Sequence, residues 1–164
     1  MKGGVMPCEG ITALEALAIA IRREMDMQGL YMEMATHTEN DILKERFLNL
    51  AQEARRNQLL LEKKYQEMFP DVELKLPPSQ LPGKMLDVKQ LKKMGLKDIL
   101  QTAIDQIKQA KEFYLDCALE ATDLSGKRMF RYLADMKFSH LMMLNSELEM
   151  IEKYPSYYEG PTPW

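Results

Sequence analysis

The sequence predicts an all-α protein in which four helices form two antiparallel hairpins joined by a long crossover. Apolar residues recur at helical spacing over four long segments. The second pair of segments repeats the first pair 83 positions later, without a gap from residue 20 to residue 65. A stretch over 70–95 that contains four of the eight prolines separates the two pairs. We expect one domain over residues 1–164, a length that can bury a proper core.

The first helix is predicted over residues 12–36. Thr12 and Glu15 have the spacing of a capping box, in which a hydroxyl and a carboxylate satisfy free backbone N–H groups. A helical wheel places Glu24 on the inward stripe, where it is the only carboxylate. The stripe also holds Leu17, Ala20, Gln28, Tyr31 and Ala35.

The second helix is predicted over residues 41–69, with Asn40 or Asp41 as its cap. The turn before it is short, so the two helices should pack antiparallel. The residues predicted to face inward are Phe47, Leu50, Ala54, Asn57, Leu61 and Met68.

The crossover over 70–95 shows no sustained helical period, although DVKQLKKM could form a turn or two. Structureless segments this long are uncommon in compact domains unless they have a geometrical task. A helix of about 25 residues is roughly 37 Å long at 1.5 Å per residue, and an extended crossover spans that distance. We therefore expect it to run from one end of the bundle to the other.

The second hairpin is predicted over residues 96–122 and 124–153, with Asp123 as a cap and Pro155 as a stop. Its last helix places Lys137 and His140 on the inward stripe. The repeat aligns Ala20 with Ala103, Ile21 with Ile104, Tyr31 with Tyr114, Phe47 with Phe130, Leu50 with Leu133 and Leu61 with Leu144.

Composition excludes several classes of function. A net charge of −3 and a pI near 5.5 argue against nucleic-acid binding, which needs a concentrated basic face. The apolar run ALEALAIAI is too short for a membrane span. Cys8 and Cys117 are too few for a disulfide framework, and no CxxC pair is present. We expect two reduced thiols and a cytoplasmic protein.

Methionine and the C-terminal tail suggest contacts between subunits. The chain has 14 methionines, many in two clusters, and a flexible thioether suits both core filling and adaptable interfaces. The tail SYYEGPTPW, residues 156–164, carries the only tryptophan, and we expect it to clamp onto the bundle or onto a neighbouring subunit. A homodimer is the expected assembly.

The repeat resembles the rubrerythrin family of the ferritin-like superfamily. The resemblance is carried by AI..E......Y on one helix and by F..LA, followed by a slot for histidine, on the next. It covers both hairpins and implies a ferritin-like four-helix bundle. Members of the family bind two irons through one Glu from each of two helices and a Glu-x-x-His from each of the other two.

The resemblance also implies that most of those ligands are lost. The six ligand positions fall on Glu24, Ile107, Ala54, Asn57, Lys137 and His140, so one carboxylate and one imidazole remain. A di-iron centre needs carboxylates to balance its charge, and here one such position carries an ammonium group. We expect no catalytic residue and no cofactor. If a metal such as iron is held, Glu24 and His140 would bind it, with Glu53 or Asn57. Glu33 and His37 have metal-like spacing but point away from the core.

An ion pair offers a reason for Lys137 to be buried. An unpaired carboxylate at Glu24 would be costly to bury, and Lys137 should face it across the bundle. We hypothesise that the Lys137 ammonium does the electrostatic work of the missing cations. Alternatively, Lys137 snorkels out to solvent. The side chains predicted around the site are those of Gln28, Tyr31, Glu53 and Tyr114.

Three functions remain open at this point. The first is a structural or binding module with a degenerate di-iron site. The second is the non-haem iron oxidoreductase that the resemblance implies, reducing peroxide or oxygen. The third is a metal-free pocket in which Lys137 or His140 performs acid–base chemistry on a small molecule.

Overall fold

The computed structural model describes residues 11–85 and 87–158, and every regular element in them is helical. Four long helices form the bundle, and three shorter elements lie in the crossover and after the last helix. The long helices are α1 (Ala13–Thr36), α2 (Asp41–Met68), α4 (Leu96–Glu120) and α5 (Leu124–Lys153). The short elements are the 3-10 helix η1 (Gly83–Met85), the helix α3 (Val88–Lys93) and the 3-10 helix η2 (Pro155–Tyr158).

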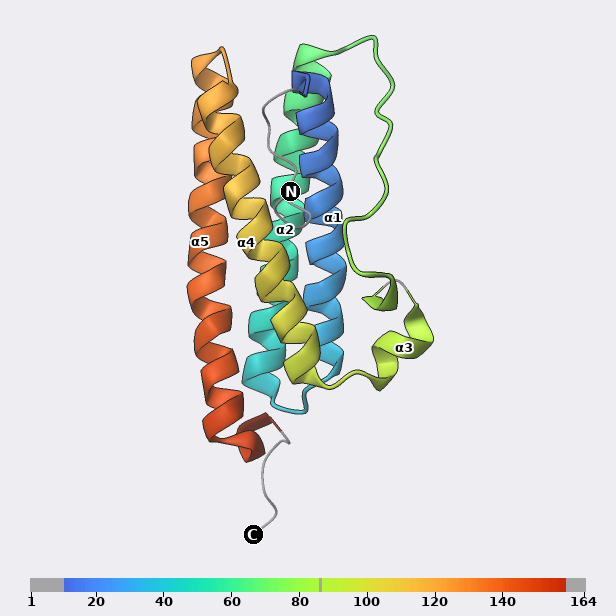
Figure 1. Cartoon of the computed structure of the whole chain (residues 1–164), viewed down its shortest axis with the longest axis vertical. Coiled ribbons are helices and arrows are strands. Elements are labelled where there is room, and N and C mark those ends of the chain that lie inside the picture. Colours follow the sequence, from blue (N-terminus) through green and yellow to red (C-terminus); the bar gives the residue numbers. More distant parts are fainter. Residues whose placement is uncertain (1–10, 86, 159–164) are drawn as a thin grey trace.

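The long helices form the two predicted hairpins (Figure 1). The helix α1 packs against α2, α4 packs against α5, and α1 also contacts α4. Between α2 and α5, long polar side chains make the connection. Arg46 Nη1 donates to Glu147 Oε1 at 2.9 Å, and Lys64 Nζ donates to Asp123 Oδ2 at 3.0 Å. These charged pairs add to the apolar side chains that α2 and α5 contribute to the core.

The helix starts follow the capping chemistry of the sequence. Thr12 and Glu15 form the capping box at α1, and the side chain of Asn40 accepts a hydrogen bond from Leu43 N at α2. Asp123 caps α5 by accepting from Gly126 N at 3.0 Å. A Cβ atom at Gly126 would lie 2.7 Å from Asp123 Oδ1, so the cap needs a glycine there.

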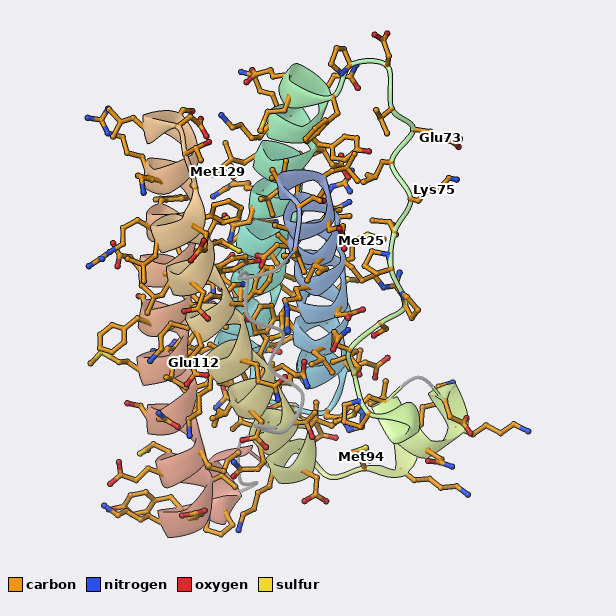
Figure 2. The ribbon with its side chains drawn as sticks, turned by 45° about the horizontal axis from the view of Figure 1, so that its top comes forward. Met25, Glu73, Lys75, Met94, Glu112 and Met129 are labelled. Carbon is orange, nitrogen blue, oxygen red and sulfur yellow. The ribbon has the colours of Figure 1, made fainter. Side chains whose placement is uncertain are left out.

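The crossover runs along α1 from one end of the bundle to the other (Figure 1). Asp26 of α1 holds it in place, because its Oδ2 accepts hydrogen bonds from Ser79 Oγ at 2.8 Å and from Gln80 N at 3.3 Å. Figure 2 shows Glu73 and Lys75 projecting from the crossover away from the helices. The stretch DVKQLKKM forms the six-residue α3, in agreement with the predicted turn or two.

The core has two apolar clusters with a polar layer between them. One cluster fills the end of the bundle near the α1–α2 turn, and the other fills the end near the α4–α5 turn. Glu24, Asn57, Lys137 and His140 are buried in the layer between the clusters. The centre of the bundle therefore contains buried ionisable side chains between two apolar clusters.

Two details of the predicted helices were wrong. Met68 does not pack into the apolar core, because the last turn of α2 extends past the core and leaves it 39% exposed. The third long helix ends at Glu120 rather than 122, since Ala121 takes an extended backbone conformation. Cys8 and residues 159–164 of the tail lie outside the described residues. In the part of the chain that the structure describes, we find no helix with the length and hydropathy needed to cross a membrane.

Candidate functional site

The carboxylate of Glu24 is the centre of the buried polar layer. Lys137 Nζ donates to its Oε1 at 2.9 Å, and Asn57 Nδ2 donates to the same oxygen at 3.1 Å. Tyr114 OH donates to Oε2 at 2.6 Å. The four residues come from α1, α5, α2 and α4, so every long helix contributes one side chain to the cluster.

The predicted ion pair is present, and the snorkelling alternative for Lys137 is wrong. The side chains of Lys137 and Glu24 are both 0% exposed. An ammonium group that had turned out to solvent would show accessible surface. The pair is therefore a fully desolvated salt bridge, which is favourable only where good geometry and further hydrogen bonds compensate for lost hydration. Asn57 and Tyr114 supply those further bonds.

A second buried group adjoins the first. His140 lies with its Nε2 atom 2.5 Å from Glu53 Oε2 and its Nδ1 atom 3.3 Å from Tyr31 OH. Burial lowers the pKa of His140 and the nearby Lys137 ammonium lowers it further, although Glu53 opposes the shift. A neutral ring that donates to Glu53 and accepts from Tyr31 fits these contacts. Glu53 reaches His140 from the edge of α2, and its own side chain stays 38% exposed.

The two tyrosines act as fixed proton donors. Burial raises the pKa of Tyr31 and of Tyr114 well above the ordinary value, and the charge of Glu24 raises both further. Both phenols therefore stay protonated. Tyr114 holds one oxygen of Glu24, while Tyr31 lies edge-on to the His140 ring, with ring centroids 6.0 Å apart and planes at 85°.

Not every predicted site residue joins the cluster. Gln28 donates to Gln58 Oε1 at 3.3 Å and not to the Glu24 group, because its part of α1 faces α2 near the surface. Ala54 and Ile107 are fully buried and place aliphatic groups in the layer. Glu33 and His37 lie apart at the end of α1, 3.5 Å from each other.

Arg23 is a buried cation that the helical pattern of the sequence did not reveal. It is 3% exposed, and its Nε and Nη2 atoms have no hydrogen-bond partner in the described part of the chain. Its Cζ atom lies 5.5 Å from the centroid of the Phe113 ring. Burial lowers the pKa of Arg23, while Tyr114, Asp26 and Glu24 act to raise it. A wheel gives no signal for such a residue, which lies at the border of the buried stripe.

The cluster does not fit a di-iron centre. Across residues 11–85 and 87–158 no group of three His, Cys, Asp or Glu side chains is placed to hold a metal ion. The atoms nearest the Glu24 carboxylate are an ammonium nitrogen, an amide nitrogen and a phenol oxygen. Each of these is a donor in its present contact, whereas a metal ion requires lone pairs directed at one point.

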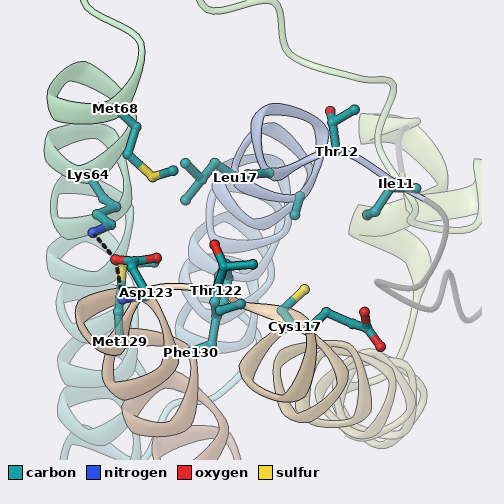
Figure 3. A pocket seen from close by; sticks show the side chains of 15 residues that line it. Ile11, Thr12, Leu17, Lys64, Met68, Cys117, Thr122, Asp123, Met129 and Phe130 are labelled. Atoms are coloured by element: carbon teal, nitrogen blue, oxygen red, sulfur yellow. Dashed lines mark hydrogen bonds and ion pairs between the residues drawn. The ribbon is translucent and has the colours of Figure 1, made fainter.

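A separate cavity of about 230 Å³ lies at the end of the bundle where α1 begins and the α4–α5 turn lies (Figure 3). Its wall is mainly apolar. Lys64 and Asp123 form an ion pair on its border, and the hydrogen bond from Lys64 is the main cause that lowers the pKa of Asp123. The lining residues include Leu17, Met68, Cys117, Ala121, Met129 and Phe130. No residue of the buried polar cluster lines this cavity.

Comparisons with known proteins agree with the fold and the repeat. The family model described as Rubrerythrin matches residues 15–148, so the chain belongs to the rubrerythrin family. A solved structure of a hypothetical protein from Pyrococcus furiosus is 28% identical, with a TM-score of 0.75 over 91% of this chain and 98% of that chain.

A second solved structure is similar in fold. It is an uncharacterized conserved protein from Magnetospirillum magnetotacticum, with 21% identity and a TM-score of 0.62 over 94% of this chain and 99% of that chain. No curated protein matches the sequence. The all-α ferritin-like bundle expected from the resemblance is therefore confirmed, while the comparisons assign no activity.

Proposed function

We propose that the protein is a metal-independent scaffold or binding module of the rubrerythrin family. The observation that carries the proposal is the buried pair of Lys137 and Glu24, 2.9 Å apart, in the layer that the family uses for two irons. In this reading, Glu24 and Ile107 occupy the positions of the two single glutamates. The two Glu-x-x-His positions are occupied by Ala54 with Asn57 and by Lys137 with His140.

Charge balance supports this reading. A buried carboxylate without a counter-ion would carry a large desolvation cost. The Lys137 ammonium neutralises Glu24 and keeps the helices at the spacing that the cluster needs. An iron ion entering the layer would meet that ammonium as well as two aliphatic side chains.

The binding role rests on the cavity at the end of the bundle. Its volume of about 230 Å³ and mainly apolar wall suit a small apolar molecule, since a smaller engineered cavity is known to bind benzene. The Lys64–Asp123 pair on the border would favour a molecule with one polar end. Exposed methionines on α5, such as Met142 and Met143, support a homodimer as the working assembly.

Thermal unfolding with toluene tests the cavity. We expect the Tm of the wild type to rise with toluene concentration, because a ligand that binds only the folded state stabilises it. Ala121→Leu should fill part of the cavity and abolish the rise, while Ala118→Leu, outside the lining, should retain it. Equal responses in wild type and Ala121→Leu would count against a binding role at this site.

The alternative function is that of a non-haem iron oxidoreductase. The observation in its favour is that Glu53, His140 and Glu24 all reach the same buried layer. Its test is peroxide consumption by protein that has been incubated with ferrous iron and then desalted. We expect a rate equal to that of His140→Gln. A rate that depends on iron and falls in His140→Gln would replace the first proposal with this one.

A further inference from the structure

The polar cluster joins a lysine, an asparagine and a glutamate through a single oxygen atom. Glu24 Oε1 accepts both from Lys137 Nζ at 2.9 Å and from Asn57 Nδ2 at 3.1 Å. The amine and the carboxamide belong to different helices, α5 and α2. All three side chains are buried, with at most 2% exposure, so the arrangement is sealed from bulk water.

We propose that Lys137 and Asn57 condense to form an isopeptide bond between their side chains, with Glu24 as the proton carrier. The amine nitrogen of Lys137 attacks Asn57 Cγ, a C–N bond forms, and the bond from Cγ to Nδ2 breaks. One molecule of ammonia leaves. The step exchanges one amide for another, so it needs neither an oxidant nor a reductant nor an external cofactor.

Glu24 is placed to carry each proton that moves in this step. It can take the proton of the Lys137 ammonium along the 2.9 Å hydrogen bond, which leaves an uncharged amine and an uncharged acid. The acid then delivers its proton to Nδ2, with which it already shares a hydrogen bond, and the nitrogen departs as ammonia. The attacking nitrogen loses its surplus proton to the same carboxylate, so Glu24 ends the step as an uncharged acid.

The surroundings favour condensation over hydrolysis. Tyr114 holds the other carboxylate oxygen at 2.6 Å, so Glu24 cannot rotate away from the amine and the amide. Holding two reacting groups together in a rigid site replaces a bimolecular encounter with a unimolecular step. Exclusion of water protects the tetrahedral intermediate from competing reactions.

The product would join α2 and α5 covalently, beside the polar contacts Arg46–Glu147 and Glu53–His140 that already connect these two helices. The bond would persist in the unfolded chain, where it would close a loop between residues 57 and 137. This inference depends on the geometry of the cluster and not on the proposed scaffold or binding role. Either of the two can therefore fail alone.

Intact-protein mass spectrometry tests the inference. We expect wild-type protein, folded and incubated at neutral pH, to be lighter than its sequence mass by one ammonia, about 17 Da. Trypsin should release one fragment that contains both residue 57 and residue 137. Asn57→Ala, which keeps the ion pair and the fold, should show the full sequence mass.

Three further variants separate the step from other losses of ammonia. Lys137→Arg keeps the positive charge but lacks the amine, and Glu24→Gln lacks the proton carrier, so both should show their full sequence masses. Asn49→Ala, at an exposed asparagine of the same helix, should be lighter by the same amount as wild type. Wild type at its full mass after prolonged incubation would overturn the inference. So would a deficit that persists in Lys137→Arg, because it would come from cyclisation at an asparagine.

Discussion

Replacing Lys137 with methionine tests how the centre of the bundle is stabilised. The Lys137→Met substitution removes the ammonium group and retains an unbranched side chain of similar length. Glu24 would then remain fully buried, with hydrogen bonds from Asn57 and Tyr114 but without a counter-ion. The substitution therefore isolates the contribution of the positive charge.

The structure sets the expected magnitude. Removing one partner of a buried ion pair typically costs about 3–5 kcal/mol, because the other charge stays buried without compensation. The two remaining neutral donors favour the lower half of that range, about 3–4 kcal/mol. For a chain of this size, 1 kcal/mol corresponds to roughly 2–4 °C in Tm. We therefore expect the Tm to fall by about 6–16 °C.

Urea unfolding of four proteins gives the coupling between the two charges. They are the wild type, Lys137→Met, Glu24→Gln and the double variant, each checked by mass so that only chains without a cross-link are compared. The double variant buries no charge at this site, so it should be more stable than Lys137→Met alone. We expect a coupling energy of at least about 2 kcal/mol. A loss below about 1 kcal/mol in Lys137→Met would refute this reasoning.

Three other predictions concern the parts around the centre. Because the pKa of His140 lies below its ordinary value of 6.5, the unfolded chain binds protons first as the pH falls, so the wild type should lose stability below pH 6.5. Urea unfolding at several pH values should show a weaker dependence in His140→Gln, and an unchanged dependence would contradict the assignment. Ser79→Ala removes a hydrogen bond between the crossover and Asp26. Limited proteolysis within residues 70–82 should therefore become faster, while the free energy of unfolding changes by about 1 kcal/mol or less. Unchanged cleavage would mean that other contacts hold the crossover. Gly126→Ala should lower the free energy of unfolding, measured with denaturant, by about 1–2 kcal/mol, because the new Cβ atom would displace the Asp123 side chain from the cap. An unchanged free energy of unfolding would show that the cap can move.

Local chemistry and the internal repeat predicted most of the fold. The capping residues Thr12, Asn40 and Asp123 mark helix starts in the sequence, because their side chains compete for free backbone N–H groups. The spacing of 83 residues related the two hairpins, and the ligand positions implied by the resemblance to the rubrerythrin family placed Lys137 opposite Glu24. The ion pair at the centre followed from the cost of burying one charge without another.

Features that depend on three-dimensional packing could not be predicted in the same way. A wheel gave Gln28 the same inward direction as Glu24, but the approach of α2 directs it to Gln58. Arg23 lies at the border of the stripe, and only the closeness of α4 buries it against Phe113. The cavity depends on how four helix ends meet, and the sharing of one oxygen by Lys137 and Asn57 depends on side-chain rotamers.

The most direct test of the central claim is the iron content of the purified protein. The chain should be produced in iron-supplemented cells and measured by elemental analysis beside a variant that restores the family's ligands, with Ala54→Glu, Asn57→His, Ile107→Glu and Lys137→Glu. If the ammonium of Lys137 has taken the place of the metals, the wild type should contain well under one iron per chain, and the restored variant should approach about two. About two irons per chain in the wild type would contradict the account.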